Sequence, residues 1–333
     1  MASVTQVSVV MGVFDGGEEV DTAIASVVAQ LEGSDELIIV NDGSGPGTTG
    51  RLRAWAKREP RIHLEEQENH GLTAALIRGC DLARAPVIVR QDADDVSLPG
   101  RLQALKRVFA QDPAPVLASS WVECVGPGGE VLYVTTRPLD PDRNRHALLY
   151  ERLGPPCHGA VAFSRPTYLA VGGYRAAFRY GQDADLWLRL AERGGVACVP
   201  QVLYRFTHNL RGISSTRRFH QRLFGELGQA CAAARRAGRD DVPLLAQAAE
   251  ILSRPAPSER HADADALYFV GSCLLRRGDP RSAGYLWRSY VKTPWRLRSL
   301  AKSLAATALR LVRRRAPDGA PPAPPPESSP AQP

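Results

Sequence analysis

Short apolar segments alternate with amphipathic segments from residue 6 to about residue 120, and this alternation constrains the fold more than any other feature. The apolar segments, which we expect to be strands, are residues 6–14, 36–40, 62–66 and 87–90. The segments between and after them carry apolar residues at helical spacing and cover residues 18–31, 49–58, 71–83 and 99–110. Strands that are apolar on both faces, with amphipathic helices between them, predict an α/β fold whose mostly parallel sheet is covered by helices.

The remainder of the chain has a different character. Residues 116–215 mix strand signals with a helix at 183–193, and residues 217–315 are mostly helical. The last segment, APDGAPPAPPPESSPAQP, is too rich in proline to form a packed core. We therefore predict an α/β domain at residues 1–215, a helical C-terminal region at 216–315 and a disordered tail at 316–333.

Cysteine usage and hydropathy indicate a cytoplasmic protein. The six cysteines are scattered and form no CxxC pair, which argues against a zinc site or a disulfide framework and fits a reducing compartment. The first residues lack the basic region of a secretory signal, and no segment approaches the roughly 18–20 apolar residues of a membrane span.

Three aspartates, Asp92, Asp94 and Asp95, directly follow the fourth apolar segment. Like charges repel and resist desolvation, so a cationic partner is expected beside them. Ligands of parallel sheets bind beyond the carboxyl ends of the strands, and Asp15 and Asp42 follow two other strands at that edge. Two alternatives stay open for the triplet: turn and helix-cap residues, or carboxylates that hold a hard divalent cation through Asp92 and Asp94.

Four segments, in their order and spacing, resemble family 2 glycosyltransferases, the nucleotide-sugar-dependent enzymes of the GT-A fold. VSVVMGVFDGGEEVDTAIASVVAQ resembles the opening strand and helix of that family, and ELIIVNDGSG resembles its second strand and acidic turn. ENHGLTAALIRGCDLARAPVIVRQDADDVSLPGRL resembles the stretch that runs into the DxD motif. PPCHGAVAFSRPTYLAVGGYRAAFRYGQDADLWLRLAERG, followed by VLYRFTHNLRGIS, resembles the acceptor side and the catalytic helix. The resemblance covers roughly residues 6–215.

The resemblance implies an inverting, metal-dependent glycosyltransferase. The donor would be a nucleotide-diphosphate sugar, UDP-linked by preference, with Mn²⁺ or Mg²⁺ on its diphosphate. The cation would neutralise the charge that develops on the leaving nucleoside diphosphate. The acceptor would be a hydroxyl group of a glycan or of a lipid-linked glycan.

The same resemblance assigns donor-side residues. They are Phe14, Asp15, Asp42, Asp92, Arg205 and His208, with Asp94 and Asp92 as the metal ligands. Phe14 and Asp15 would flank the base, and Asp42 would accept a hydrogen bond from it, unless Asp42 only closes an Asx-turn. Asp95 is left as a helix cap. The chain departs from the family at Asp15, where asparagine is common.

Asp183 is the predicted catalytic base, since an acceptor alcohol is a poor nucleophile without a proton acceptor within hydrogen-bond reach. The alternative is an acidic residue that only favours the positive end of a helix. Asp185, two residues later, and His158 are the predicted acceptor-side residues, although each also fits a structural role.

The net charge of +7 is concentrated near the C-terminus. Residues 289–315 contain eight basic residues and no acidic one, so the rest of the chain is nearly neutral. Leucines at helical spacing among these charges predict a helix on an anionic membrane surface at the inner face of the cell membrane, or a helix that packs on the protein. A nucleic-acid role is not expected, because only Trp295 offers an aromatic ring among residues 295–315.

Two rival functions share these features. A non-catalytic nucleotide-sugar-binding or scaffold protein could keep the same fold. A nucleotidyltransferase is disfavoured, since no glycine-rich phosphate loop with a lysine lies near the N-terminus. The helical C-terminal region would cover the catalytic domain or mediate self-association into a homo-oligomer.

Overall fold

The computed structural model describes residues 6–315 apart from 211, 256–258 and 295–296. The predicted tail at 316–333 lies outside the described residues. Within the described part of the chain, no helix combines the length and the apolar character needed to cross a bilayer.

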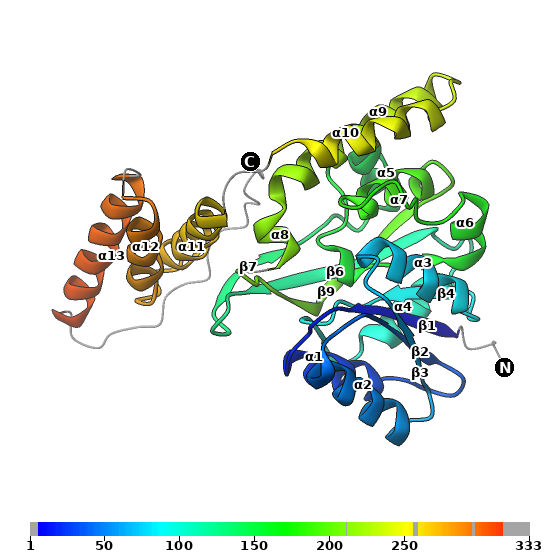
Figure 1. The fold of residues 1–333 in the computed structure, drawn as a ribbon, viewed down its shortest axis with the longest axis horizontal. Coiled ribbons are helices and arrows are strands. Elements are labelled where there is room, and N and C mark those ends of the chain that lie inside the picture. Colours follow the sequence, from blue (N-terminus) through cyan, green and yellow to red (C-terminus); the bar gives the residue numbers. More distant parts are fainter. Residues whose placement is uncertain (1–5, 211, 256–258, 295–296, 316–333) are drawn as a thin grey trace. The chain divides into compact units, whose positions relative to one another are not determined.

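One sheet organises the α/β part of the chain (Figure 1). Its order is β3-β2-β1-β4-β8-β6-β9-β5, and β7 pairs with β6. The strands are β1 (Val7–Val13), β2 (Glu36–Asp42), β3 (Ile62–Gln67), β4 (Val87–Arg90), β5 (Val96–Ser97), β6 (Leu117–Val125), β7 (Val131–Thr135), β8 (Ala162–Ser164) and β9 (Val196–Thr207). The first four strands pair in parallel, which confirms the prediction, and β8 begins an antiparallel extension next to β4.

Helices follow each of the parallel strands. In the first half of the chain they are α1 (Glu19–Val28), α2 (Pro46–Arg58), α3 (Leu72–Leu82) and α4 (Arg101–Phe109). The later ones are α5 (Pro141–Tyr150), α6 (Arg165–Ala170), α7 (Gln182–Ala191), α8 (Ile213–Thr216), α9 (Arg218–Arg236), α10 (Gln247–Ser253), α11 (Glu259–Arg276), α12 (Ser282–Lys292) and α13 (Leu297–Arg315). Two short 3₁₀ turns cover His158–Ala160 and Val242–Ala246.

Both faces of the sheet are buried, because alternate residues of each strand point to opposite faces. Val10 of β1 packs in one apolar core with residues of α3 and α7. Its neighbours Val9 and Met11 pack in a second core with residues of α1, α2 and α4. The sequence-based expectation of strands that are apolar on both faces is therefore met by β1, β2 and β4, but not by β3, where only Ile62 is buried.

The start of the helix after the DxD motif differs from the prediction. We predicted that Asp95 would cap the helix after the DxD motif, but α4 begins at Arg101 and its N-cap is Gly100, at φ 84°. Glycine adopts this left-handed conformation without a steric penalty, so no side chain caps α4. Asp95 is instead buried at the base of the loop, 1% exposed.

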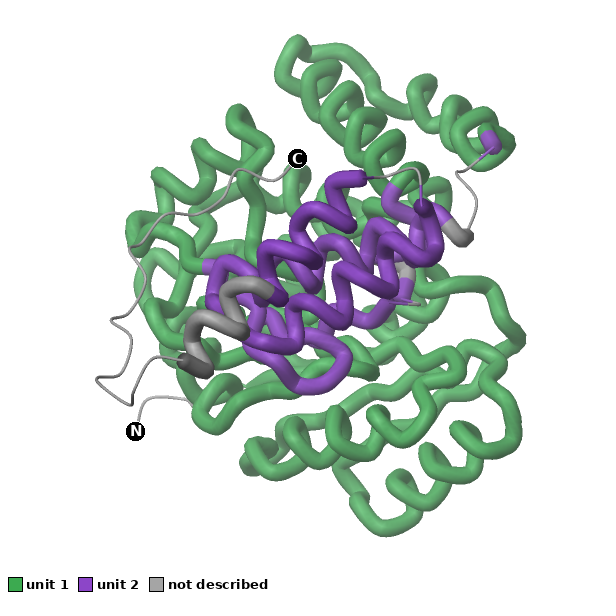
Figure 2. Tube along the Cα trace, turned by 90° about the vertical axis from the view of Figure 1, so that its left-hand side faces the viewer, with its two compact units in different colours: residues 1–123, 136–206, 219–254 green, residues 124–135, 207–218, 255–333 purple. Residues whose placement is uncertain are grey.

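The chain divides into two compact units (Figure 2). Unit 1 comprises residues 1–123, 136–206 and 219–254, and unit 2 comprises 124–135, 207–218 and 255–333. The predicted boundary at residue 215 does not reproduce this discontinuous division. Residues 219–254 belong to unit 1 because Phe224 packs on Phe178, and because Asp241 forms ion pairs with Arg175 and Arg235.

Candidate active site

Arg101 fixes the segment that carries the DxD motif. Its side chain is fully buried, and Nη2 donates to the carbonyl oxygens of Arg90 and Gly159 at 2.8 and 2.7 Å. Nη1 donates to Gln91 Oε1 at 3.1 Å and to Ser97 Oγ at 2.7 Å. A buried guanidinium with four such partners holds the end of β4 and the turn at His158–Ala160 in one arrangement.

Arg90, the last residue of β4, orients the first aspartate of the motif. Its side chain is 0% exposed, and its Nη2 donates to Asp92 Oδ1 at 2.6 Å. Nη1 donates to the carbonyl oxygen of Val10 at 2.5 Å, which ties the pair to β1. One carboxylate of the acidic triplet is thus neutralised by an internal cation.

His158 contacts this ion pair and is held in one tautomer. Its Nε2 lies 2.7 Å from Tyr174 Oη and 3.4 Å from the Nε of Arg90, which is a donor. Nε2 therefore accepts, and the proton of the neutral ring is on Nδ1. Burial, together with the charge of Arg90, holds the pKa of His158 well below its usual value of 6.5.

Gly159 allows Tyr204 and Asp92 to approach the backbone closely. A Cβ atom at position 159 would lie 1.9 Å from Tyr204 Oη and 2.8 Å from Asp92 Oδ2. Tyr204 is fully buried, and its Oη accepts from the backbone N–H of Asp92 at 3.2 Å. No larger side chain fits at position 159 without displacing the motif.

Asp183, the predicted base, is the second residue of α7, and the structure brings it close to the DxD motif. Its Oδ1 accepts from the backbone N–H of Ala184 at 2.9 Å. Burial raises the pKa of the Asp183 carboxyl, backbone N–H groups lower it, and the charge of Asp92 raises it further. The two carboxylates therefore act on each other within unit 1. Trp187, one turn along α7, has its ring 6.2 Å from that of His158.

Asp42, at the end of β2, organises the turn that precedes α3. Its Oδ1 accepts from Gln67 Nε2 at 2.8 Å and from the backbone N–H of His70 at 2.9 Å, and Oδ2 accepts from Gly71 N–H at 2.8 Å. These bonds use three of the roughly four acceptor positions of the carboxylate, and the residue is 2% exposed. The guanidinium of Arg179 lies about 3.5 Å from the position of a Cβ on Gly71.

Asp15 and Phe14 lie at the neighbouring strand end. Asp15 has a φ of 49°, its Oδ1 accepts from the N–H of Gly45 at 2.8 Å, and its own N–H donates to Ser44 Oγ at 3.0 Å. These bonds join the loops after β1 and β2. Phe14 is 55% exposed, an unusual state for a phenylalanine next to a buried strand, and a ring in this state can stack on a ligand.

The metal prediction depends on Asp92 and Asp94. Among the described residues, no three His, Cys, Asp or Glu side chains converge as a protein-only metal cage would require. A cation that travels with a diphosphate needs only one or two carboxylates, since phosphate oxygens and water complete its shell. Two half-buried carboxylates separated by one residue fit this donor set.

Three predicted residues have other environments. Asp185 is 1% exposed and binds Arg189 at 2.6 Å, an arrangement that favours a structural role over contact with an acceptor. Arg205 is paired with Glu123 at 2.8 Å, although its backbone pairs with Val96, just beyond the DxD motif. His208 belongs to unit 2, where its ring lies 4.9 Å from that of Phe269.

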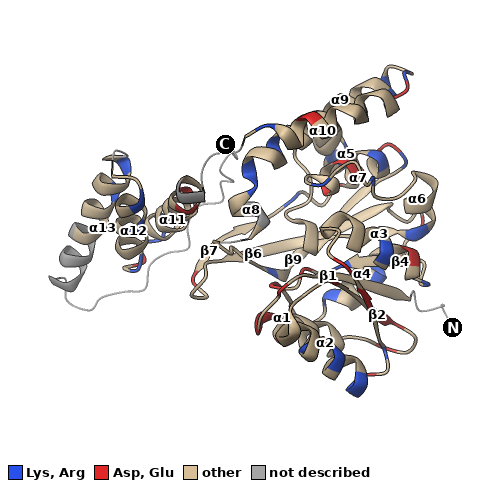
Figure 3. Cartoon of the chain, in the orientation of Figure 1, with Lys and Arg blue, Asp and Glu red and all other residues tan. Residues whose placement is uncertain are grey.

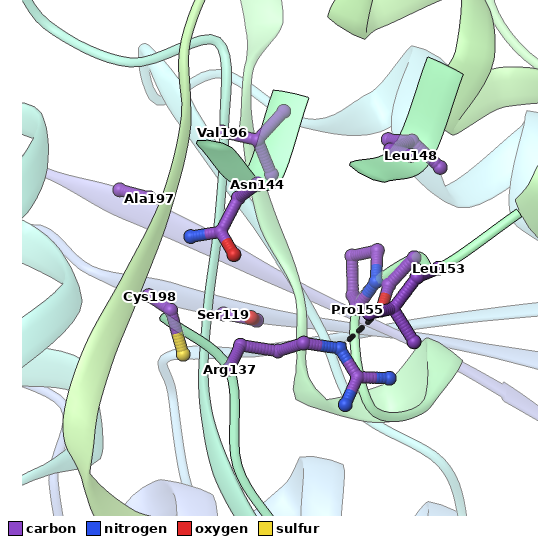
Figure 4. Close-up of a pocket in the computed structure, with 10 residues that line it drawn as sticks. Ser119, Arg137, Asn144, Leu148, Leu153, Pro155, Val196, Ala197 and Cys198 are labelled. Atoms are coloured by element: carbon purple, nitrogen blue, oxygen red, sulfur yellow. Dashed lines mark hydrogen bonds between the residues drawn. The ribbon is translucent and has the colours of Figure 1, made fainter. Parts of the chain in front are cut away.

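Five side chains around the motif were not anticipated from the sequence: Arg90, Arg101, Tyr174, Arg179 and Tyr204. The segment VIVR held one available signal, because an arginine at the end of a buried strand needs an internal anion. A separate small hollow lies between Ser119, Arg137, Asn144 and Cys198, where Arg137 Nε donates to the Gly154 carbonyl at 2.7 Å (Figure 4). None of its lining residues belongs to the aspartate cluster.

Known proteins share this sequence and fold. The model of "Glycosyl transferase family 2" matches residues 8–169. The putative glycosyltransferase EpsE of Bacillus subtilis is 30% identical over 201 residues, which are 58% of this chain and 69% of that protein. An Escherichia coli UDP-Gal:alpha-D-GlcNAc-diphosphoundecaprenol beta-1,3-galactosyltransferase is 27% identical over 56% of this chain and 68% of its own length. The amylovoran biosynthesis glycosyltransferase AmsE of Erwinia amylovora is 29% identical over 56% of this chain and 70% of its own length.

Solved structures agree at the level of the fold. The mannosyltransferase PcManGT from Pyrobaculum calidifontis, in complex with GDP-Man and Mn²⁺, superposes with a TM-score of 0.52 at 20% identity. The match covers 93% of this chain and 88% of the PcManGT chain. The structure of TarS residues 1–349 from S. aureus superposes with a TM-score of 0.52 at 10% identity, and the match covers 93% of this chain and 92% of the TarS chain. The sequence relatives and the shared fold together show that this chain is a glycosyltransferase with the GT-A fold and belongs to glycosyltransferase family 2.

Proposed function

We propose that this glycosyltransferase transfers a sugar, with inversion, from a nucleotide-diphosphate sugar to a hydroxyl group of a growing polysaccharide or of a lipid-linked glycan. The observation that supports the proposal is the position of α7 beside the DxD motif. The ring of Trp187, one turn after Asp183, lies 6.2 Å from that of His158, which accepts from Arg90, the partner of Asp92. Relatives named for a diphosphoundecaprenol-linked acceptor and for amylovoran biosynthesis support the acceptor class. A UDP-sugar is the preferred donor, as in the name of the galactosyltransferase relative.

Asp183 acts as the base in this proposal. Its Oδ1 is bound to the N–H of Ala184, which leaves Oδ2 to take the proton of the acceptor hydroxyl. The acceptor oxygen then bonds to the anomeric carbon while the bond from that carbon to the diphosphate oxygen breaks. A raised carboxyl pKa makes a stronger base, and one displacement inverts the anomeric centre.

The donor side consists of loops at the carboxyl ends of β1, β2 and β4. Phe14 and Asp15 would flank the base, and the remaining acceptor position of Asp42 would face it. Asp94 and Asp92 would hold Mn²⁺ or Mg²⁺, which supplies Lewis-acid stabilisation of the leaving diphosphate. The Mn²⁺ in the PcManGT complex supports a divalent cation here.

Release of UDP from UDP-sugars in the presence of Mn²⁺ tests the proposal. Asp183→Asn and Asp94→Asn should each lower turnover by about 10²-fold or more. Asp142→Asn is the matched control, since Asp142 is also an acidic residue in the first turn of a helix, α5, and should keep full turnover. Unchanged turnover in both site variants would refute the enzymatic roles and favour the rival reading, a non-catalytic nucleotide-sugar-binding protein.

A further inference from the structure

Helix α13 packs in unit 2 through its small polar side chains. Ser299 and Ser303 are buried, and Ser299 Oγ lies 3.2 Å from Ser289 Oγ of α12. Ser303 Oγ donates to the carbonyl oxygen of Ala283, also in α12, at 3.2 Å. An amphipathic helix of a globular protein normally buries its leucines. The described part of α13 buries Ser299, Ser303 and Ala306 instead, so its packing there is reversed.

Two leucines in the described part of α13 are exposed. Leu297 is 67% and Leu304 is 63% exposed, and Leu300, between them on the same face by helical spacing, is partly exposed. On α12, Trp287 and Val291 are also exposed, at 51% and 53%. Large apolar side chains that are exposed together mark an interaction surface more often than a solvated one.

The charge of these two helices indicates the partner. Neither α12 nor α13 contains an acidic residue, whereas Arg288, Lys292, Arg298 and Lys302 lie on them within the described side chains (Figure 3). Arg288 and Arg298 are exposed beside the apolar residues. A cationic surface with exposed leucine and tryptophan is complementary to anionic lipid headgroups above an apolar interior.

We propose that the exposed side of α12 and α13, defined here as the lipid-docking face by Trp287, Val291, Leu297, Leu304 and Arg298, binds an anionic membrane surface. In this arrangement the leucines enter the boundary between headgroups and acyl chains, and Arg298 contacts phosphate groups. The biological purpose of this membrane binding depends on the proposed function, because a lipid-linked acceptor is presented at a membrane. Its physical basis, the reversed packing of α13, is independent of catalysis.

Sedimentation of the full-length protein with vesicles tests this directly. Binding is compared between vesicles of phosphatidylcholine alone and vesicles that also contain phosphatidylglycerol, at low and high salt. Wild type should bind the anionic vesicles, and salt should weaken the binding. Leu297→Gln/Leu304→Gln should weaken it by about tenfold or more, because two apolar contacts are lost. Arg298→Gln should weaken it by about fivefold on anionic vesicles only.

Matched controls distinguish a loss of membrane binding at the lipid-docking face from a loss of protein stability. Leu169→Gln replaces a half-exposed leucine of α6 in unit 1 and should leave vesicle binding unchanged. The melting temperature should be the same for all variants, since the replaced side chains are exposed and glutamine favours a helix. A large fall in that temperature for the double leucine variant would show that the leucines are packed in solution, and would overturn the inference.

Two other results would also overturn it. The first is a wild type that binds neither kind of vesicle. The membrane inference would then fail, whereas turnover of UDP-sugars would still support the proposed function. The second is a wild type that self-associates in sedimentation velocity and dissociates in the double leucine variant, without vesicle binding. The face would then be an interface between two copies of the chain.

Discussion

Arg90 and Asp92 form an ion pair in which the arginine side chain is fully buried and the aspartate side chain is 26% exposed. The cation is therefore internal, while the anion reaches the surface at the end of β4. This asymmetry fixes the carboxylate in place but leaves part of it available to a ligand. The pair also positions His158 through Arg90 Nε.

Replacement of Arg90 by lysine should impair both stability and turnover. Lysine can occupy the site with one ammonium group, but it cannot reach Asp92, the Val10 carbonyl and His158 in the fork geometry of a guanidinium. We expect a loss of about 1–3 kcal/mol in the free energy of unfolding. Turnover of UDP-sugars should fall more steeply than the folded fraction. Arg84→Lys is the control, because Arg84 is 81% exposed in its pair with Glu36 and should change stability by less than about 1 kcal/mol.

Gly159→Ala should disrupt the active site. The new methyl group would overlap Tyr204 Oη, at 1.9 Å, and the displaced tyrosine would release the N–H of Asp92. Turnover should drop by about 10²-fold, which is the effect of a shift of roughly 1 Å in positioned groups. The double variant Gly159→Ala/Tyr204→Phe should recover part of the lost stability, since the overlapping hydroxyl is gone.

A glycine with open space around it provides the comparison. Gly50 lies inside α2 with nothing within 4 Å of its Cβ position. Gly50→Ala should raise the melting temperature slightly and leave turnover intact, since alanine stabilises a helix interior by about 0.5–1 kcal/mol. Equal effects of the two substitutions would contradict a specific role for the close approach at Gly159.

The pH dependence of turnover should report Asp183. The base must be ionised, and burial raises its pKa above the usual aspartate value of 3.8. Turnover should therefore fall with decreasing pH, and the apparent pKa of this fall should lie above the pKa of an ordinary aspartate. The profile of kcat/KM against pH measures this limb, and Asp142→Asn should not move it. A limb at or below 3.8 would exclude Asp183 as the titrating base.

The stability of unit 2 should depend on pH through His208. Burial, together with the charge of Arg218, lowers the pKa of His208 to about 4, whereas the unfolded chain has a histidine of ordinary pKa, about 6.5. Between these values the unfolded state binds more protons, so stability decreases as the pH falls below about 6.5. The loss at a pH of about 5 should be on the order of 2 kcal/mol. Urea unfolding at two pH values measures it.

His208→Gln should flatten this dependence, whereas replacement of the exposed His146 should not. An unchanged slope in the His208 variant would show that the imidazole remains solvated in the native state. Because His208 and Asp183 titrate in different units, the stability profile and the turnover profile should separate.

The sequence was informative where local pattern and tertiary environment agree. The parallel strands β1–β4 were predicted within two residues of their observed ends. The apolar runs of β1, β2 and β4 are buried on both faces, whereas β3 (IHLEEQ) buries only Ile62. The start of α2 was missed by three residues, since Pro46 occupies the first turn, where its missing N–H is not needed. The aspartates after the strands were found because strand ends of a parallel sheet converge.

Other features depend on contacts between distant residues, and no local pattern encodes them. Tyr174 and Tyr204 reach the motif from 82 and 112 positions beyond Asp92, so their proximity exists only in the folded chain. The assignment of residues 219–254 to unit 1 depends on Asp241, whose partner Arg175 lies on the loop before α7. Gly100 took the cap position expected of Asp95 because the chain must turn through positive φ there.

The anchoring of the DxD segment by Arg101 bears on donor choice. Its four hydrogen bonds are formed within the protein itself, so no chain ordering at this segment is needed when a nucleotide sugar arrives. Affinity differences among donors would then originate in side chains without such anchoring, above all the exposed Phe14 and Arg179. We therefore predict that exchange of these two residues between related transferases alters sugar-nucleotide preference.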